Sequence, residues 1–359
     1  MKKKLAFLLS ACLLLAVAAY AAGGEDSLVS LSYLTGTFLG NVEDRVDQEL
    51  DKSDAAILEQ AADGEIDLSS ASSWQETRLK RGDLLLGTTG TNVLLLAGSG
   101  RVTYTSGAVV DVTTGTQVAS GTALAVNHRY MVAEDTSADF EVTSRTAVVD
   151  YQGGYSFSYS DEVDYNAMAA ALKSLHLFRG SFTGYGEGFD LELTPTRLQA
   201  LIMFIRVLGE EEQALAWTGT THFTDISKGS DAEKYVGYAY EMGYTNGYSA
   251  TQFKPGKAVN AGQYTEFVLR ALGYSSAANT DLSDTLLRAE EAGVLTSGET
   301  ALLRTEKFLR ADLVYISYYA LNARLPDSRD TLADVLMDKG VFQRAEWRDA
   351  ENMVTSGRL

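Results

Sequence analysis

The chain has 359 residues, a formal net charge of −18 at pH 7, one cysteine and 45% hydrophobic residues, so its length suggests two or three domains with sizeable cores. One cysteine excludes a disulfide scaffold and a cysteine-based zinc site, and the acidic charge argues against a nucleic-acid binder, which needs a cationic surface. Three histidines far apart in the sequence (His128, His176, His222) leave little for a metal site, so the composition leans away from an enzyme and no cofactor is expected.

The first 22 residues are typical of a secretory signal peptide. Lys2–Lys4 form a cationic start, Leu5–Ala19 an apolar run, and Ala19-Tyr20-Ala21 a small-x-small cleavage pattern. An uncleaved membrane anchor is the alternative, but the run is shorter than the roughly 20 residues that a span needs. Lipidation of Cys12 is a second alternative, because the residues before it resemble an acylation box. We predict an exported protein with no later transmembrane span.

Residues 23–73 are predicted to contain one helix and a linker. Val42, Val46 and Leu50 recur every fourth position among charged residues, which is typical of an amphipathic helix. The Asp- and Ser-rich stretch 63–73 reads as the linker.

Residues 74–159 are predicted to form a β-rich module. Short β-branched runs alternate with turn residues, which favours a compact antiparallel barrel or sandwich. His128 is interpreted as a surface histidine, and we assign this module no chemistry and an unknown partner. The expected strands are Leu84–Leu86, Val93–Leu96, Val102–Tyr104, Val109–Val112, Leu124–Val126, Tyr130–Val132, Phe140–Val142 and Ala147–Tyr151.

Residues 160–325 are predicted to be helical and to contain a motif three times, at about 164–209, 222–274 and 281–325. The stretches 196–209 and 260–273 share one apolar spacing and end in Arg-x-Leu-Gly, and 309–321 is a looser copy. A bulky apolar residue (Phe189, Phe253, Leu302) lies eight positions before the Arg197, Ala261 and Arg310 positions. Upstream, a first helix ends at a glycine pair or its remnant: His176 and Gly180, Gly243 and Gly247, Gly293 and Gly298. One hairpin cannot bury its apolar stripe alone, so we expect the three to pack around a shared core.

The repeats resemble the S-layer homology family, and the middle copy carries the fullest match. It contains Phe223-Thr224-Asp225, Gly243…Gly247, Phe253-Lys254-Pro255 and a helix ending in Arg270-Ala271-Leu272-Gly273. The resemblance implies a pseudo-threefold, three-pronged bundle that anchors exported proteins to the bacterial envelope. It also implies a partner, a secondary cell-wall polysaccharide that often carries acidic pyruvyl groups, bound in grooves between the prongs.

The family's pattern assigns candidate polysaccharide-binding residues. An arginine at a helix start suits a sugar carboxylate, because its planar fork donates bidentate, charge-assisted hydrogen bonds near free backbone N–H groups. Tyr244 is our own candidate for stacking against a sugar. The residues that match the family's motif are Arg197 and Arg310 for the arginine, Gln199 and Asp312 for the glutamate that follows it, and Gly180 and Gly247 for the turn glycine.

The chain also departs from the family's pattern. Ala261 and Asn260 stand where the middle repeat needs arginine and threonine, which predicts a weak or inactive groove there, and Asp231 replaces a tryptophan. The charge of −18 opposes an anionic polymer, although screening over about 8 Å lets a local arginine dominate distant acids. Alternatively, Arg197 and Arg310 pair with nearby carboxylates and only lock the prongs together.

The fold class expected overall is multidomain α+β, with a β module, a three-repeat all-α bundle and closing helices in 326–359. No phosphate-binding loop, dinucleotide fingerprint, zinc helix or nucleophile elbow is present in the sequence. Three functions remain open. They are a non-catalytic envelope protein that binds wall polymer, a degenerate repeat domain for protein–protein contact, and a carbohydrate-active enzyme with its site in the β module.

Overall fold

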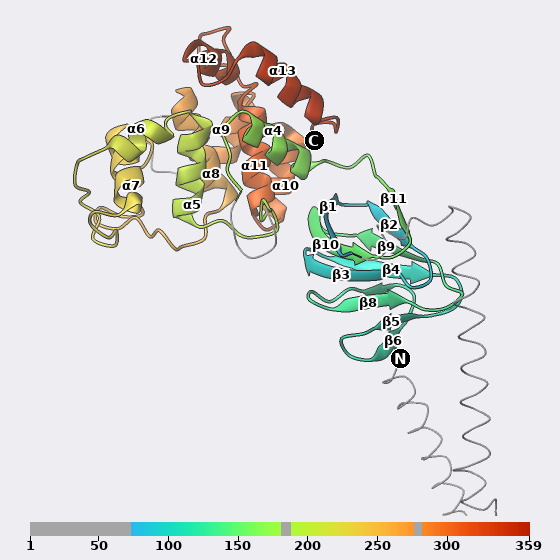
Figure 1. The fold of residues 1–359 in the computed structure, drawn as a ribbon. Coiled ribbons are helices and arrows are strands. Elements are labelled where there is room, and N and C mark those ends of the chain that lie inside the picture. Colours follow the sequence, from blue (N-terminus) through green and yellow to red (C-terminus); the bar gives the residue numbers. More distant parts are fainter. Residues whose placement is uncertain (1–72, 181–187, 276–281) are drawn as a thin grey trace, which may run out of the picture. The chain divides into compact units, whose positions relative to one another are not determined.

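The structure is a computed structural model, and it describes residues 73–180, 188–275 and 282–359 (Figure 1). All of these belong to the unit Ser69–Leu359. The expected signal peptide and the helix expected around Val42–Leu50 lie outside the described residues. No helix in the described ranges is both long enough and apolar enough to cross a membrane.

The β module is a pair of antiparallel sheets. The six-stranded sheet has the order β1-β10-β3-β8-β5-β6, and the five-stranded sheet has the order β11-β2-β9-β4-β7. The prediction of an antiparallel sandwich-like module is therefore confirmed. The strands are β1 (Gln75–Lys80), β2 (Leu84–Gly87), β3 (Asn92–Ala97), β4 (Gly100–Tyr104), β5 (Val109–Asp111), β6 (Thr116–Val118), β7 (Thr122–Ala123), β8 (Arg129–Val132), β9 (Ala138–Val142), β10 (Thr146–Gln152) and β11 (Tyr155–Ser158).

Alternating side chains explain how the two sheets share a core. In β4, Val102 is fully buried while its neighbour Arg101 is exposed and pairs with Glu141 across the strand pair at 2.6 Å. The inward residues, which include Leu85, Val93 and Phe140, form one hydrophobic cluster. Burial of this apolar face is what holds the module together.

Some strand predictions differ from the structure. The expected strand Leu124–Val126 is wrong: β7 ends at Ala123, and the chain then turns through Asn127, which has φ of +64°. Four strands, β1, β6, β7 and β11, were not predicted, because charged, short or serine-rich segments lack the β-branched run on which the prediction depended. His128 lies half-buried, and its Nδ1 is 2.8 Å from Asp111 Oδ2.

The rest of the described chain is helical, as expected, and has one large core. The helices α5, α8 and α11 contact one another pairwise, and Tyr264 on α8 shares a 2.5 Å hydrogen bond with Ser317 on α11. The helices are α4 (Tyr165–Ser174), α5 (Arg197–Val207), α6 (Glu211–Ala216), α7 (Asp231–Glu241), α8 (Ala261–Leu272), α9 (Thr285–Glu291), α10 (Ser297–Thr305), α11 (Arg310–Ala320), α12 (Leu332–Asp338) and α13 (Arg344–Met353).

The first helix of each predicted repeat ends in the same way. His176, Gly243 and Gly293 have φ of 62°, 74° and 70°, which is the left-handed conformation that stops a helix. The next N–H then bonds back to a carbonyl of the last helical turn, from Leu177 to Leu172, from Tyr244 to Ala239 and from Val294 to Ala289. The glycine-turn prediction is confirmed for the second and third copies, and a histidine replaces glycine in the first.

The third copy departs from the expected loop. Gly298 and Leu302 lie inside α10, so Gly298 is a helical residue and Leu302 is half-buried rather than a core anchor. The cause is local, because Thr296 and Glu299 form a reciprocal capping box that starts a helix where the middle copy has an open loop. The expectation that both residues match the middle copy is therefore wrong.

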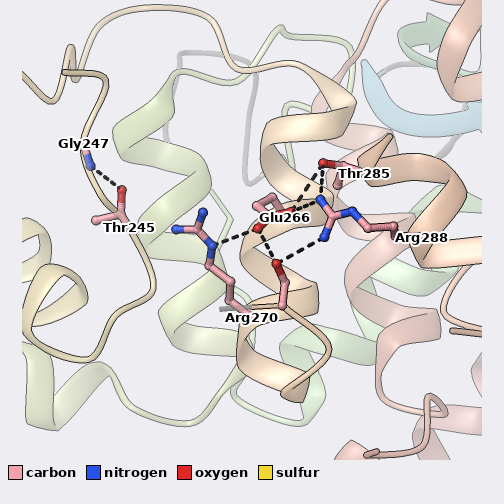
Figure 2. A network of polar contacts seen from close by, with 7 residues as sticks. Thr245, Gly247, Glu266, Arg270, Thr285 and Arg288 are labelled. Carbon is pink, nitrogen blue, oxygen red and sulfur yellow. Dashed lines mark hydrogen bonds and ion pairs between the residues drawn. The ribbon is translucent and has the colours of Figure 1, made fainter. Parts of the chain in front are cut away.

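A buried carboxylate joins α8 to α9. Glu266 is 2% exposed and accepts from Arg270 Nε at 3.0 Å and Arg288 Nη2 at 2.8 Å, and Ser275 Oγ donates to it at 2.6 Å (Figure 2). A buried carboxylate needs such partners, because an unpaired one would carry a large desolvation cost. Glu266 therefore serves the packing of these helices.

The last two helices, α12 and α13, pack on the helical core. The N–H of Leu332, the first residue of α12, donates to Ala323 O at 3.0 Å. On α13, Trp347 is 7% exposed and stacks on Phe342 with ring centroids 6.0 Å apart. Both rings belong to the large helical core.

Candidate functional site

The start of α5 is attached to a loop of the middle repeat. Thr196 caps the helix, and its capping-box partner is Gln199. The N–H of Arg197 donates to Lys257 O at 2.8 Å, and the N–H of Leu198 donates to Pro255 O at 3.2 Å. Two N–H groups that a helix start leaves free are thus satisfied by another repeat, which brings Arg197 beside residues more than 50 positions away.

The guanidinium of Arg197 is buried and is held through its Nε atom. The residue is 5% exposed, its Nε donates to Phe253 O at 2.9 Å, and its charged carbon lies 5.0 Å from the Phe253 ring centroid. Burial lowers the pKa of Arg197, but an arginine stays protonated in a protein. Among the described residues nothing accepts a hydrogen bond from its two Nη atoms, so both remain available as donors.

Two lysines and an exposed tyrosine complete the cluster, which we call the Arg197 site (Arg197, Tyr248, Lys254, Lys257). The Nζ atoms of Lys254 and Lys257 lie 4.3 and 4.2 Å from the Tyr248 ring centroid, and Arg197 lies 5.9 Å from it. Lys257 Nζ also donates to the Tyr248 hydroxyl at 2.9 Å, and this bond lowers the pKa of Tyr248. The Tyr248 side chain is 44% exposed, so the site faces solvent.

Among the described residues, Asp225 supplies the one carboxylate that is found near Arg197. Asp225 accepts the backbone N–H groups of Phe253 and Lys254 at 2.9 and 2.7 Å, which holds the loop in place. Lys254 itself has φ of +58°. With three cations against one carboxylate, the Arg197 site is locally positive on a protein whose net charge is −18.

Arg310 has the same backbone frame but different neighbours. Its N–H donates to Leu193 O at 2.8 Å and its Nε donates to Phe189 O at 3.2 Å, as Arg197 does to Lys257 and Phe253. Asp190, with φ of +51°, stands where the first site has Lys254. Burial lowers the pKa of Arg310, and the charges of Asp190 and Glu192 oppose that shift. Two carboxylates therefore lie near Arg310, where the cation of Arg206 also lies, whereas the Arg197 site has two lysines.

The residues predicted to follow each arginine act as helix caps. Gln199 closes the Thr196 box. Asp312 accepts from the Leu309 N–H at 2.7 Å and from Arg145 Nη1 at 2.6 Å, and it is 2% exposed. Burial raises the pKa of Asp312 to about 6. Both side chains are engaged within the protein, and their predicted role in binding polysaccharide stays untested.

The predicted turn glycines differ from each other. Gly247 has φ of +81°, and its N–H donates to Thr245 Oγ1 at 3.1 Å (Figure 2). An added Cβ would lie 2.3 Å from the Phe223 ring. At Gly180 a Cβ would lie 2.7 Å from Gly188 O. Both positions are therefore too tight for a side chain, and only Gly247 also needs the left-handed conformation.

The sequence analysis expected Tyr244 to expose its ring for stacking on a sugar, but the structure packs this ring inside the protein. Its hydroxyl donates to Glu210 at 2.9 Å, its ring packs edge-on against Phe204 at 5.4 Å, and burial raises its pKa. Its role in stacking stays a prediction, but Tyr248 has the exposed ring that such a role requires. The sequence argument missed Tyr248, Lys254 and Lys257 as site residues, although the motif Phe253-Lys254-Pro255 was a usable signal.

In the middle copy, the position that matches Arg197 is taken by Ala261. Asn260 caps α8 through Gln263, and Ala261 is 5% exposed. Across residues 73–180, 188–275 and 282–359, no group of three or more His, Cys, Asp or Glu side chains is placed to hold a metal.

Comparison with known proteins shows what part of this chain is similar to. Residues 222–265 match the S-layer homology domain, and this stretch includes Tyr248, Lys254 and Lys257. The chain is also 28% identical over 195 residues to a protein of Thermoanaerobacter kivui named "Cell surface protein", with 52% of this chain and 24% of that protein covered. The chain thus spans about a quarter of that relative's length. Residues 222–265 are thus similar to an S-layer homology domain, the family that the sequence resembles.

Similar solved structures add no argument. Pumpkin pro-11S globulin is 12% identical with a TM-score of 0.17, covering 28% of each chain. Procruciferin of Brassica napus is 9% identical with a TM-score of 0.17, covering 28% of this chain and 27% of that one.

Proposed function

We propose that this protein is held at the cell wall by binding a secondary wall polysaccharide at the Arg197 site. The observation that carries the proposal is the convergence of three cations on one exposed tyrosine ring. The coarser conclusion, an exported protein of the cell surface, follows from the S-layer homology match and the surface-protein relative.

The chemistry of the site favours a sugar that carries a carboxylate, such as a pyruvyl ketal. The two open Nη atoms of Arg197 match the two oxygens of a carboxylate, and such charge-assisted pairs are the stronger hydrogen bonds. The Tyr248 ring offers an apolar surface for the sugar, and Lys254 and Lys257 add positive charge. Because charges beyond about 8 Å are screened at physiological salt, these local cations outweigh the acidic average of the chain.

We further propose that the three predicted repeats form a pseudo-threefold bundle with unequal grooves. Support comes from α5, α8 and α11, which contact one another, and from the matching backbone frames at Arg197 and Arg310. Asp190 and Glu192 beside Arg310, and Ala261 in the middle copy, remove positive charge from the other two grooves. The Arg197 site is then the main contact with the polymer.

We propose a non-catalytic role for the β module. The cavity of about 10 Å³ between its sheets is lined mainly by leucine and valine, which leaves room for about one water molecule. This supports close packing between the two sheets. A second cavity of about 630 Å³ is lined by Asp83 and Tyr159 of the module together with Asp161 and Glu162, so a carbohydrate-active site in residues 74–159 is kept as an alternative. The other alternative is that the repeats serve protein–protein contact alone, and the sedimentation experiment below distinguishes it from polymer binding.

The test is sedimentation of the protein with purified cell-wall sacculi, before and after chemical removal of the secondary polymer. We expect pelleting with intact sacculi and loss of pelleting with stripped ones. Arg197→Ala should lower pelleting strongly and Arg310→Ala only weakly. Equal pelleting with intact and stripped sacculi would show that polymer recognition is wrong.

A further inference from the structure

The strand β11 forms an open edge of the five-stranded sheet. It pairs antiparallel with β2, with Tyr155 opposite Gly87 and Ser158 opposite Leu84. Within the part of the chain that the structure describes, no strand pairs with its other side. Such an edge presents free N–H and C=O groups to any strand that can lie beside it.

The hydrogen-bond pattern says which backbone groups are free. The Thr88 N–H donates to Gly154 O at 3.0 Å, which makes this opposite pair a hydrogen-bonded one. Because bonded and non-bonded pairs alternate along an antiparallel ladder, Ser156 and Ser158 also bond to β2. The N–H and C=O groups of Tyr155, Phe157 and Tyr159 therefore point outward.

The other sheet edges are protected and β11 is not. The edge strand β1 carries Glu76, Arg78 and Lys80, and the edge strands β6 and β7 have only 3 and 2 residues. Charge and short length are the usual means of preventing edge-to-edge pairing. The stretch 153–160 has no charged residue and no proline.

The sequence of this edge is a palindrome, Tyr155-Ser156-Phe157-Ser158-Tyr159. We infer that β11 pairs with β11 of a second copy of this chain, antiparallel and centred on Phe157. In that register Phe157 faces its own counterpart and Tyr155 faces Tyr159 of the second copy. These are the residues whose backbone groups point outward, so all three residue pairs would be hydrogen-bonded. The contact would be symmetric about a two-fold axis, with the same strand contributed by both copies.

The side chains and charges suit this pairing. Tyr155, Phe157 and Tyr159 already form a ladder with ring centroids 5.4 and 5.8 Å apart, and aromatic pairs across strands stabilise sheets. The stretch 153–160 itself carries no charge, and the nearby Lys80, 5.7 Å from the Tyr159 ring centroid, is paired with Asp83 at 2.6 Å, so two chains of net charge −18 meet here with little local repulsion. Because their remaining repulsion is screened by salt, association should strengthen as ionic strength rises.

The test uses Ser156 and Ser158, whose side chains are exposed and lie on the opposite face from the aromatic rings. In the proposed register Ser156 of one copy faces Ser158 of the other at a non-hydrogen-bonded pair, where side chains come closest. The double variant Ser156→Lys with Ser158→Lys places like charges opposite each other twice. The double variant Ser156→Glu with Ser158→Lys places opposite charges there instead.

Sedimentation velocity of the whole chain over a concentration series measures the association. We expect a dimer for the parent chain, an increase of about tenfold in the dissociation constant for the Lys/Lys variant, and parent-like or tighter association for the Glu/Lys variant. A parent chain that is monomeric at all concentrations overturns the inference, as does a dimer that all variants leave unchanged. A dimer that appears only after removal of residues 1–72 also overturns it, because the chain's own N-terminal segment would then cover the edge.

Discussion

Replacing Lys254 by aspartate should give the Arg197 site the same charge at this position as the Arg310 site has at Asp190. The backbone should tolerate the change, because Lys254 has φ of +58° and Asp190 already occupies the matching position with φ of +51°. The perturbation is therefore confined to charge, and its main effect should fall on an anionic ligand beside Tyr248.

The expected magnitude follows from the distances in the site. Lys254 Nζ is 4.3 Å from the Tyr248 ring centroid, so a carboxylate bound beside that ring lies about 5 Å from it. Reversing one charge at this distance in a water-like dielectric costs about 2 kcal/mol, because Lys254 is only half-buried. Affinity for the wall polymer should fall about 30-fold.

The assay is binding of purified sacculi over a range of protein concentrations. Lys254→Arg, which keeps the charge, should bind within about threefold of the parent. Lys228→Asp makes the same charge change at an exposed lysine outside the cluster and should have little effect. If both aspartate variants lose affinity equally, net charge rather than the Arg197 site governs binding, and the reasoning is refuted.

Two further variants test the local geometry. Gly247→Ala should lower the free energy of unfolding by at least about 2 kcal/mol, since the φ of Gly247 is +81° and the new Cβ would meet the Phe223 ring. The control is Gly256→Ala, whose new Cβ would have no atom within 4 Å. It should change the free energy of unfolding, measured by chemical denaturation, by less than about 1 kcal/mol. Asp312→Asn should remove a pH dependence: the folded-state pKa of about 6 exceeds the ordinary 3.8, so between these values the folded state binds more protons and stability falls as pH rises. The parent should thus lose up to about 3 kcal/mol relative to the variant between pH 4 and pH 6, and parallel stability curves over this range would contradict the assignment.

Local features of the fold could be predicted because they depend on a few neighbouring residues. A cap such as Thr196 with Gln199, or a glycine such as Gly243 after a helix, satisfies backbone groups within one turn. The same rule explains one wrong prediction, because the segment of the Thr296–Glu299 capping box was expected to be a loop and instead starts α10. Strands were found where β-branched runs are buried and missed where, as in β11, serine alternates with aromatic residues.

The amino-acid sequence by itself indicated the resemblance to the S-layer homology family, the prediction of repeats and the interest of Arg197 and Arg310, because those follow from spacing and motif. Only the tertiary structure decided which loop meets each helix start, and so which charges surround each arginine. Arg197 meets Lys254 and Lys257, whereas Arg310 meets Asp190, although both have the same backbone frame. That difference depends on contacts between repeats, whose partners are set by packing of the shared core and not by any local pattern.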